Sequence, residues 1–313
     1  MFCGRDLEGT PVRSQLQKAA AVLLTVAIFA LILRRVPFPA LAAALRDADH
    51  ATFLALMIPN TLFYFAWDTL VLTVVIGWFH GPVAYRDLLP VRAASYVVGF
   101  FNTNLGRGAM AAYLSRRLQA PFLELGSTVI FLVLTEYTQL VLWAMLGLFG
   151  FRAEVSRSLF AAAGGVAILW LGIRWLLAPR AWAIFRTFRL ATPARYATIV
   201  LLRAPMFLVS LVVHYHAAHA FGIHIPFGTL LTFLPVIFML AALPITVAHL
   251  GTTQAAWIFF FSQFAPVPRL LAFSLAAHLV FSSTRAILGV LWLPSAYGDL
   301  IRRAPDRSIV TTS

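Results

Sequence analysis

The chain has 313 residues, of which 61% are hydrophobic and only 11% are charged, and its mean hydropathy is +0.86. Soluble domains carry about a quarter of their residues as charged side chains, so this composition excludes an ordinary soluble enzyme. The net charge of +13 would suit a nucleic-acid binder, but most arginines lie between apolar runs, as membrane-flanking residues do. The sequence therefore predicts an integral membrane protein without a nucleic-acid partner.

Six segments are long enough to cross a bilayer, because a spanning helix needs about 20 predominantly apolar residues. In chain order they are approximately 18–36, 52–79, 122–150, 158–178, 197–221 and 268–295. The first segment could instead be a signal peptide cleaved after Ala40-Leu41-Ala42. The later apolar segments already commit the chain to the membrane and favour an uncleaved first span.

Two further apolar regions are broken by polar residues and glycines. The first runs over about 89–118 with a break at 102–108, and the second runs over about 227–264 with a break at 243–254. The arms beside each break are mostly too short to span, and irregular backbone is tolerated at membrane depth only where protein or a polar cavity satisfies it. We expect two re-entrant helical hairpins. The alternative is two ordinary spans in each region, joined by a short loop.

Arginine placement predicts the topology, since cytoplasmic loops carry an excess of Lys and Arg. Segment 174–195 is the richest in arginine, the C-terminal tail carries three arginines, and residues 222–226 carry no Lys or Arg. Both termini are therefore predicted to be cytoplasmic, in a multi-pass protein of the bacterial cytoplasmic (inner) membrane. The first hairpin would enter from the cytoplasm and the second from outside. Arg34, Arg35, Arg46, Arg152 and Arg157 fall on the outer side of this topology.

The two halves of the predicted domain correspond to each other. Residues 18–150 and 158–296 each read as span, span, hairpin and span, between tails at 1–17 and 297–313. Leu105-Gly106 and Leu250-Gly251 lie at corresponding places in the two breaks. Three crossings in each half invert the second half relative to the first, as in many secondary transporters. The predicted fold is all-α and polytopic, with six spanning helices and two re-entrant hairpins in an inverted repeat.

Charged residues within predicted spans are costly and mark candidate functional sites, and three of them stand out. They are Asp68, Glu136 and Arg285. Glu136 and Arg285 lie at similar depths from the cytoplasmic ends of their spans, so we expect them to approach each other. The pair would either bind substrate or act as a purely structural ion pair.

The hairpin breaks form a second candidate site. A helix that begins after Gly106 or Gly251 would place free backbone N–H groups at membrane depth, where they attract anions such as a lipid phosphate. Thr252 and Thr253 can cap the second of these helices, and Arg107 adds positive charge beside the first. The alternative is that both breaks are ordinary helix ends that only close the fold.

Metal and cofactor sites are not indicated. His214, His216 and His219 do not share one helical face, and we interpret them as histidines near the outer interface. Cys3 is the only cysteine, which excludes an intrachain disulfide and a thiolate cluster. No common catalytic motif is present, so we expect neither an enzyme nor a cofactor.

The layout resembles the flippase-like transmembrane region of the bacterial lysylphosphatidylglycerol synthase family. The matching stretches are 91–139, with Asn104 to Gly108 and Glu136, and 243–288, with Leu250 to Gln254 and Arg285. The family has Gly-Glu, Glu-Arg and an acidic residue where this chain has Gly106-Arg107, Glu136-Tyr137 and Gln254. The resemblance implies a stand-alone member without the aminoacyltransferase domain, which binds or moves a lipid-like substrate.

We therefore expect a lipid translocase that handles an anionic lipid or lipid-linked substrate. The predicted substrate-binding residues are Asp68, Asn104, Gly106, Arg107, Glu136, Gly251, Thr252, Thr253, Gln254 and Arg285. One alternative is a membrane-embedded enzyme on a lipid or polyprenyl-linked substrate, with Glu136 or Asp68 as general base. Another is a non-transporting accessory subunit of a lipid or glycan pathway, acting with a partner protein or as a homo-oligomer.

Overall fold

The structure is a computed structural model that describes residues 37–101, 103–151, 182–241 and 251–302, together with Gly165 and Gly172. These residues form helices and no β-strand, which confirms the all-α prediction for this part of the chain. The helices are α2 (Phe38–Arg46), α3 (His50–Phe79), α4 (Tyr85–Phe101), α5 (Thr103–Leu118), α6 (Phe122–Phe151), the 3₁₀ turn η2 (Ala183–Phe185), α8 (Arg186–Leu190), α9 (Pro193–Leu202), α10 (Ala204–His219), α11 (Phe227–Ala241), α12 (Thr252–Phe261) and α13 (Val267–Arg302).

Four helical stretches are long and apolar enough to cross a membrane. They are His50–Phe79, Phe122–Gly150, Pro193–His219 and Val267–Ser295. They match four of the six predicted spans, and the other two, 18–36 and 158–178, lie outside the described residues except for Gly165 and Gly172. Helix α13 continues to Arg302, so it extends beyond the predicted end of the last span. The four stretches are compatible with a multi-pass membrane protein.

The third of these stretches is interrupted between α9 and α10. Pro205 lies in the first turn of α10 and has no backbone N–H, so the helical hydrogen-bond ladder cannot continue through this point. Side chains from two other helices satisfy the carbonyls at the break. Trp67 Nε1 donates to the Leu202 carbonyl at 2.7 Å, and Gln139 Nε2 donates to the Arg203 carbonyl at 3.1 Å. The interruption leaves Arg203 buried between the helices.

Helices α4 and α5 form an antiparallel hairpin. Arg117, near the end of α5, pairs with Asp87, near the start of α4. At the other end of the pair, a Cβ atom added to Gly106 would lie 2.7 Å from the Gly99 Cα atom. The two backbones therefore touch where only glycine fits. With 17 and 16 residues, these helices are shorter than the four long stretches.

Helices α11 and α12 pair in the same way. Phe233 of α11 stacks on Phe260 of α12, with ring centroids 4.6 Å apart. The predicted break at 243–254 lies mostly outside the described residues. Its last part is described: Gly251 has φ +94°, a left-handed conformation that favours glycine, and α12 begins at the next residue.

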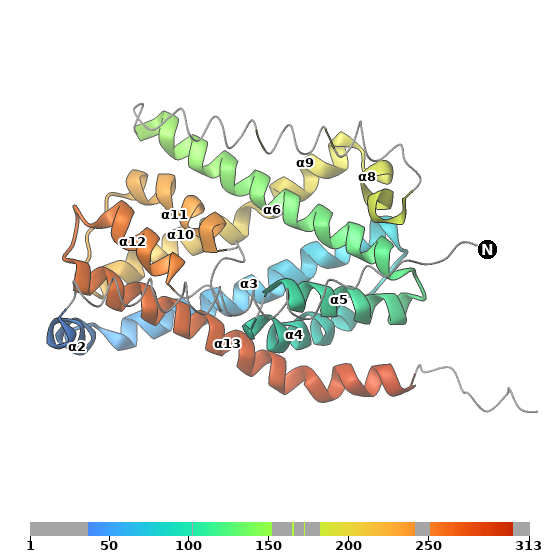
Figure 1. Cartoon of the computed structure of the whole chain (residues 1–313), viewed down its shortest axis with the longest axis horizontal. Helices are drawn as coiled ribbons and strands as arrows, with labels where there is room; N and C mark the ends of the chain where they lie inside the picture. Colours follow the sequence, from blue (N-terminus) through green and yellow to red (C-terminus); the bar gives the residue numbers. More distant parts are fainter. Residues whose placement is uncertain are drawn as a thin grey trace, which may run out of the picture.

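The two hairpins point inward from opposite ends of the helical bundle (Figure 1). One end is rich in arginine: Arg186 pairs with Glu124 at the start of α6, and Arg195 lies over the rings of Trp78 and Phe79 at the end of α3. The α4–α5 hairpin opens at this end. At the other end the Asp49 N–H donates to the Ala220 carbonyl, and the residues before α11 and after α12 lie there.

Helix α6, which follows α5, packs on α11, and helix α13, which follows α12, packs on α4. A Cβ atom added to Gly147 of α6 would lie 2.7 Å from the backbone nitrogen of Thr232 in α11. One added to Gly289 of α13 would lie 2.7 Å from the carbonyl oxygen of Ala93 in α4. The same kind of close backbone contact thus occurs between α6 and α11 and between α13 and α4.

The two largest hydrophobic cores of the described residues occupy the two ends of the bundle. One contains Phe53, Phe221 and Phe273, and the other contains Phe79 and Phe131. Helix α3 contributes its first turns to one core and its last turns to the other. The stretch of α3 between them carries polar residues, and this is where the candidate site lies.

Candidate functional site

A cavity of about 300 Å³ lies between the two cores. On α3 it is lined by five residues spaced three or four apart, which therefore share one face of the helix: Met57, Asn60, Tyr64, Asp68 and Leu72. Helices α4, α5, α6, α10, α11, α12 and α13 provide the rest of the lining, together with Arg203 between α9 and α10. Residues near both hairpin tips take part, Gly106 and Arg107 from α5 and Ala241 and Thr253 from α11 and α12.

Asp68 is held between two arginines. One carboxylate oxygen forms an ion pair with Arg92 Nη2, and the other lies 3.6 Å from Arg203 Nη1. The side chains of Asp68 and Arg203 are only 7% and 5% exposed, so little water screens this group. Arg92 also lies over the ring of Tyr96, with its guanidinium carbon 5.0 Å from the ring centroid. The Asp68 carboxylate is therefore fixed from two sides.

Glu136 has looser partners. Its Oε2 atom lies 3.4 Å from Arg107 Nη2, and its Oε1 atom accepts a hydrogen bond of 3.4 Å from the Tyr64 hydroxyl. Both distances are at the long end for hydrogen bonds, and the Glu136 side chain is 28% exposed. This pair joins α6 to the tip of the first hairpin without fixing either side chain tightly.

Arg285 lies on aromatic rings. Its guanidinium carbon is 3.8 Å from the centroid of the Tyr96 ring and 5.0 Å from that of Phe281. Such stacking stabilises a cation but does not neutralise it. Among the residues that the structure describes, Arg285 forms no ion pair, and its buried Nε atom has no hydrogen-bond partner.

The described lining has more positive than negative charge. Arg92, Arg107, Arg203 and Arg285 stand against Asp68 and Glu136, which leaves a formal excess of two positive charges, four minus two. The cavity also has hydrogen-bond donors without acceptors. Five of the six buried polar atoms without a partner in the described residues belong to its lining: Asn60 Nδ2, Tyr96 Oη and the Nε atoms of Arg92, Arg203 and Arg285. Each of the five can donate a hydrogen bond.

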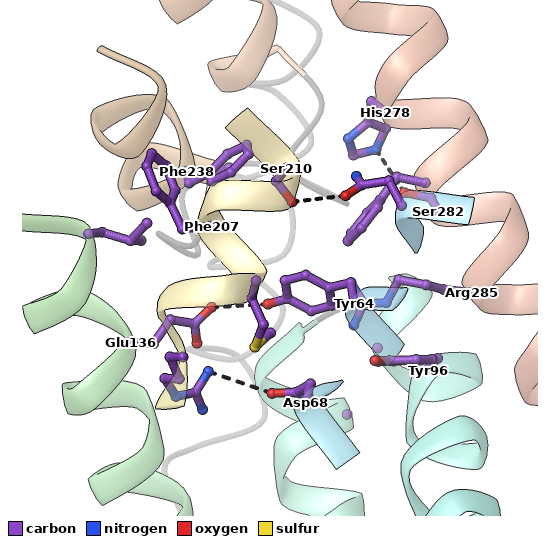
Figure 2. A pocket seen from close by; sticks show the side chains of 18 of the residues that line it. Tyr64, Asp68, Tyr96, Glu136, Phe207, Ser210, Phe238, His278, Ser282 and Arg285 are labelled. Carbon is purple, nitrogen blue, oxygen red and sulfur yellow. Dashed lines mark hydrogen bonds and ion pairs between the residues drawn. The ribbon is translucent and has the colours of Figure 1, made fainter. Parts of the chain in front are cut away.

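The cavity is also partly apolar. Phe207 and Phe238 lie on the side away from Asp68, as Figure 2 shows, and Met57, Leu140 and Trp257 add to the apolar lining. Glu136, Tyr64 and Arg285 lie between that side and Asp68. One cavity thus offers a cationic, donor-rich region next to an aromatic one.

The structure brings most of the predicted site residues together. Asp68, Gly106, Arg107, Glu136, Thr253 and Arg285 all line the cavity. Gly251, Thr252 and Gln254 lie at the start of α12 and are not part of the lining. Asn104 lies in the first turn of α5, and its side chain is outside the described residues.

Three details differ from the sequence predictions. The predicted contact between Glu136 and Arg285 is replaced by the Glu136–Arg107 pair, because the α5 tip lies next to α6. Helix α5 begins at Thr103, so Gly106 lies inside its first turns and serves close packing instead of preceding a helix N-terminus.

The third difference concerns the cap of α12. Its N-cap is Gly251, which has no side chain, so neither threonine occupies the capping position. Gln254 supplies a bond instead, since its Oε1 atom accepts from the Gly251 N–H at 2.7 Å. We infer that Gln254 has a structural role at this helix end.

Arg92, Arg203 and His214 are site residues that the sequence reasoning missed. Arg203 lies inside a predicted span and Arg92 inside a predicted hairpin arm, so the rule that selected Asp68 could have found both. His214 was assigned to the outer interface, but it is buried and lines the cavity, and its Nδ1 atom lies 2.7 Å from the Ser210 carbonyl. In the described ranges, no group of three or more His, Cys, Asp or Glu side chains could hold a metal ion.

Comparison with known proteins adds no relative. No known family model matches this chain, and no curated protein matches it. The resemblance to the lysylphosphatidylglycerol synthase family therefore stays a prediction, and the function has to be argued from the cavity.

Proposed function

We propose that this protein binds an amphiphile with an anionic headgroup inside the bilayer and moves it between the two leaflets. The observation that carries the proposal is the composition of the cavity. Its described lining has two more arginines than carboxylates, and five buried polar atoms of this lining have no hydrogen-bond partner among the described residues. Buried donors are normally satisfied, so an acceptor-rich anion such as a phosphate is the complementary ligand.

The apolar lining supports an amphiphile over a free ion. Phe207, Phe238 and Trp257 offer apolar surface next to the cationic region, which an inorganic anion would leave unused. Charged side chains are expensive at membrane depth and are found there mainly where they serve a substrate or ion pathway. A lipid headgroup together with the first part of its chains satisfies both regions.

The arrangement of the hairpins supports movement across the bilayer. Residues beside both polar breaks line one central cavity, and the two helix pairs lie toward opposite ends of the bundle. Transporters built from inverted repeats with discontinuous helices have this pattern. In this proposal the six spans and two re-entrant hairpins form an inverted repeat in the cytoplasmic membrane, and the arginine-rich end faces the cytoplasm. The sequence has no nucleotide-binding motif, so movement would be passive or ion-coupled.

A membrane-embedded enzyme is less well supported by the same geometry. A general base needs a carboxylate that is free to take a proton. Asp68 is held by two arginines, and Glu136 lies beside Arg107, so each carboxylate faces at least one cation. The charges of the described lining therefore favour binding of an anion over general-base catalysis.

Lipid mass spectrometry on the purified protein is the first test. Wild type should retain a specific anionic lipid beyond the bulk composition, and Arg285→Ala should lose it. Arg86→Ala is the matched control, because Arg86 is an exposed arginine on α4 outside the cavity. Bulk lipid of identical composition in all three samples would contradict the binding proposal.

Transport is tested separately in proteoliposomes. Fluorescent phosphatidylglycerol in both leaflets is quenched from outside, and the protected fraction should fall in vesicles that contain wild-type protein. Vesicles with Arg285→Ala should keep the protected fraction of empty vesicles, and fluorescent phosphatidylcholine should move more slowly than phosphatidylglycerol. If the protein retained the lipid but did not move it between leaflets, the binding proposal would stand and the translocation proposal would be wrong.

A further inference from the structure

The cavity contains a second polar region that the anion alone does not use. Asn60 is buried, and its Oδ1 atom accepts a hydrogen bond of 3.2 Å from the Ser210 hydroxyl. The other end of the amide, Nδ2, is buried without a hydrogen-bond partner, and Asn60 is one of the residues that line the cavity. Leaving an amide N–H unsatisfied in a buried site is costly, so this donor points to an acceptor on the ligand.

This donor lies away from the cationic region. Asn60 precedes Tyr64 by one turn of α3, a rise of about 6 Å, and the Tyr64 hydroxyl contacts Glu136. Figure 2 shows Ser210, His278 and Ser282 on one side of Tyr64, with Asp68 and Tyr96 on the other side. The two polar regions are therefore about one helical turn apart along α3.

The groups around Asn60 differ in chemical type from those on the Asp68 side of Tyr64. Hydroxyl, amide and imidazole groups line this level. The four arginines of the described lining have their contacts elsewhere: Arg92 and Arg203 with Asp68, Arg107 with Glu136, and Arg285 with the Tyr96 ring. An N–H group without a nearby cation suits a neutral acceptor, such as an ester carbonyl or a hydroxyl oxygen. A second anionic group would be left without a counter-charge there.

We infer that the ligand has two polar parts: an anionic group held at Arg107 and Arg285, and a neutral oxygen acceptor held by Asn60 one turn away. The inference rests on the proposed function and narrows its substrate class. A glycerophospholipid-type amphiphile fits, because its ester carbonyl or hydroxyl lies a few covalent bonds from its phosphate. A simple alkyl anion occupies only the first region.

Two probes with the same charged group separate these possibilities. Palmitoyl lysophosphatidic acid carries a phosphate, an ester and a hydroxyl, whereas hexadecyl phosphate carries the phosphate and chain alone. Their affinities are measured by calorimetry on the purified full chain in detergent. Wild type should bind lysophosphatidic acid about threefold to tenfold more tightly, the effect expected for one added neutral hydrogen bond.

The variant Asn60→Leu should remove that preference. It should weaken lysophosphatidic acid binding by about threefold to tenfold and leave hexadecyl phosphate binding unchanged. Asn60→Ala is a second variant in case the added branch prevents folding. Thr61→Val is the matched control, since Thr61 is a buried neighbour on α3 that does not line the cavity and whose hydroxyl donates to the Met57 carbonyl.

The possible outcomes distinguish this inference from the proposed function. If wild type binds both probes equally and Asn60 variants change neither affinity, the two-part ligand is wrong while the anion site stands. If wild type binds neither probe, the proposed function itself fails. If inorganic phosphate displaces either probe at equal concentration, the site takes a free anion, and both the amphiphile and the two-part ligand are overturned.

Discussion

Two carboxylates share one cavity, and they are held in different ways. Asp68 sits between Arg92 and Arg203 and is almost fully buried. Glu136 reaches Arg107 and Tyr64 only at 3.4 Å, and more than a quarter of its side chain is exposed. The Asp68 group joins α3, α4 and the interruption between α9 and α10, whereas the Glu136 pair joins α6 to a hairpin tip.

This difference separates the part of the cavity that holds the fold from the part that can respond to a ligand. A buried carboxylate with two cations cannot be released without leaving uncompensated charge. A long, partly exposed pair is worth little and can exchange its partner. An incoming phosphate can therefore replace Glu136 on Arg107 without disturbing the helices, while the Asp68 group keeps them in place.

The largest expected effect is on stability at the Asp68 group. Asp68→Ala should lower the free energy of unfolding by about 3–5 kcal/mol, because it leaves Arg92 and Arg203 buried without their counter-charge. The measurement is the thermal unfolding midpoint of the purified protein in detergent. The triple variant Asp68→Leu, Arg92→Met, Arg203→Met should recover most of that stability. An unchanged midpoint in Asp68→Ala would remove the distinction between the two carboxylates.

The next effect concerns the hairpin tip that carries Arg107. Gly106→Ala should destabilise the protein by about 1–3 kcal/mol, because the added methyl group would meet the backbone of Gly99 at 2.7 Å and of Ser95 at 2.8 Å. Gly108→Ala is the control on the same helix, with nothing within 4 Å of the added atom. It should be neutral or stabilise by up to about 1 kcal/mol. Equal unfolding midpoints for the two variants would contradict the tight α4–α5 contact.

Glu136 should affect binding more than stability. Glu136→Gln removes the negative charge that competes for Arg107, so hexadecyl phosphate should bind about threefold to tenfold more tightly in calorimetry. The unfolding free energy should change by less than about 1 kcal/mol. Weaker binding, or a stability loss as large as that of Asp68→Ala, would show that Glu136 belongs to the fixed part of the cavity.

The smallest effect is expected at Tyr64. Tyr64→Phe removes a hydrogen bond that is 3.4 Å long, so the unfolding free energy should fall by about 0.5 kcal/mol or less. Phosphate-probe affinity should stay within about twofold of wild type, since the hydroxyl holds only the loosely bound carboxylate. A large loss of affinity would indicate that the Tyr64 hydroxyl contacts the ligand itself.

Much of the fold could be predicted because hydropathy is a local property. The long apolar helices α3, α6 and α13 were found from run length, whereas the two re-entrant hairpins stay a prediction. Helix ends were less accurate: α5 begins before Gly106, because helix propensity and packing against α4 outweigh two glycines near its start.

The candidate site could be predicted only in part. The sequence predicted Asp68, Glu136 and Arg285 as site residues because each is a charged residue inside an apolar segment. All three line the cavity. The sequence could not show which charges pair, since an ion pair depends on how helices distant in sequence pack. Glu136 pairs with Arg107 and not with Arg285, because the start of α5 lies beside α6.

The sequence by itself determined that this chain is helical and apolar, and which of its charges lie within apolar segments. Those properties follow from residue type and local order along the chain. Only the tertiary structure decided that residues beside both polar breaks line one cavity, that Asp68 is shared by two arginines, and that Asn60 and Arg285 have buried donors without a partner among the described residues. The reason is that pairing and burial depend on close contacts between helices far apart in sequence, which neither length nor hydropathy records.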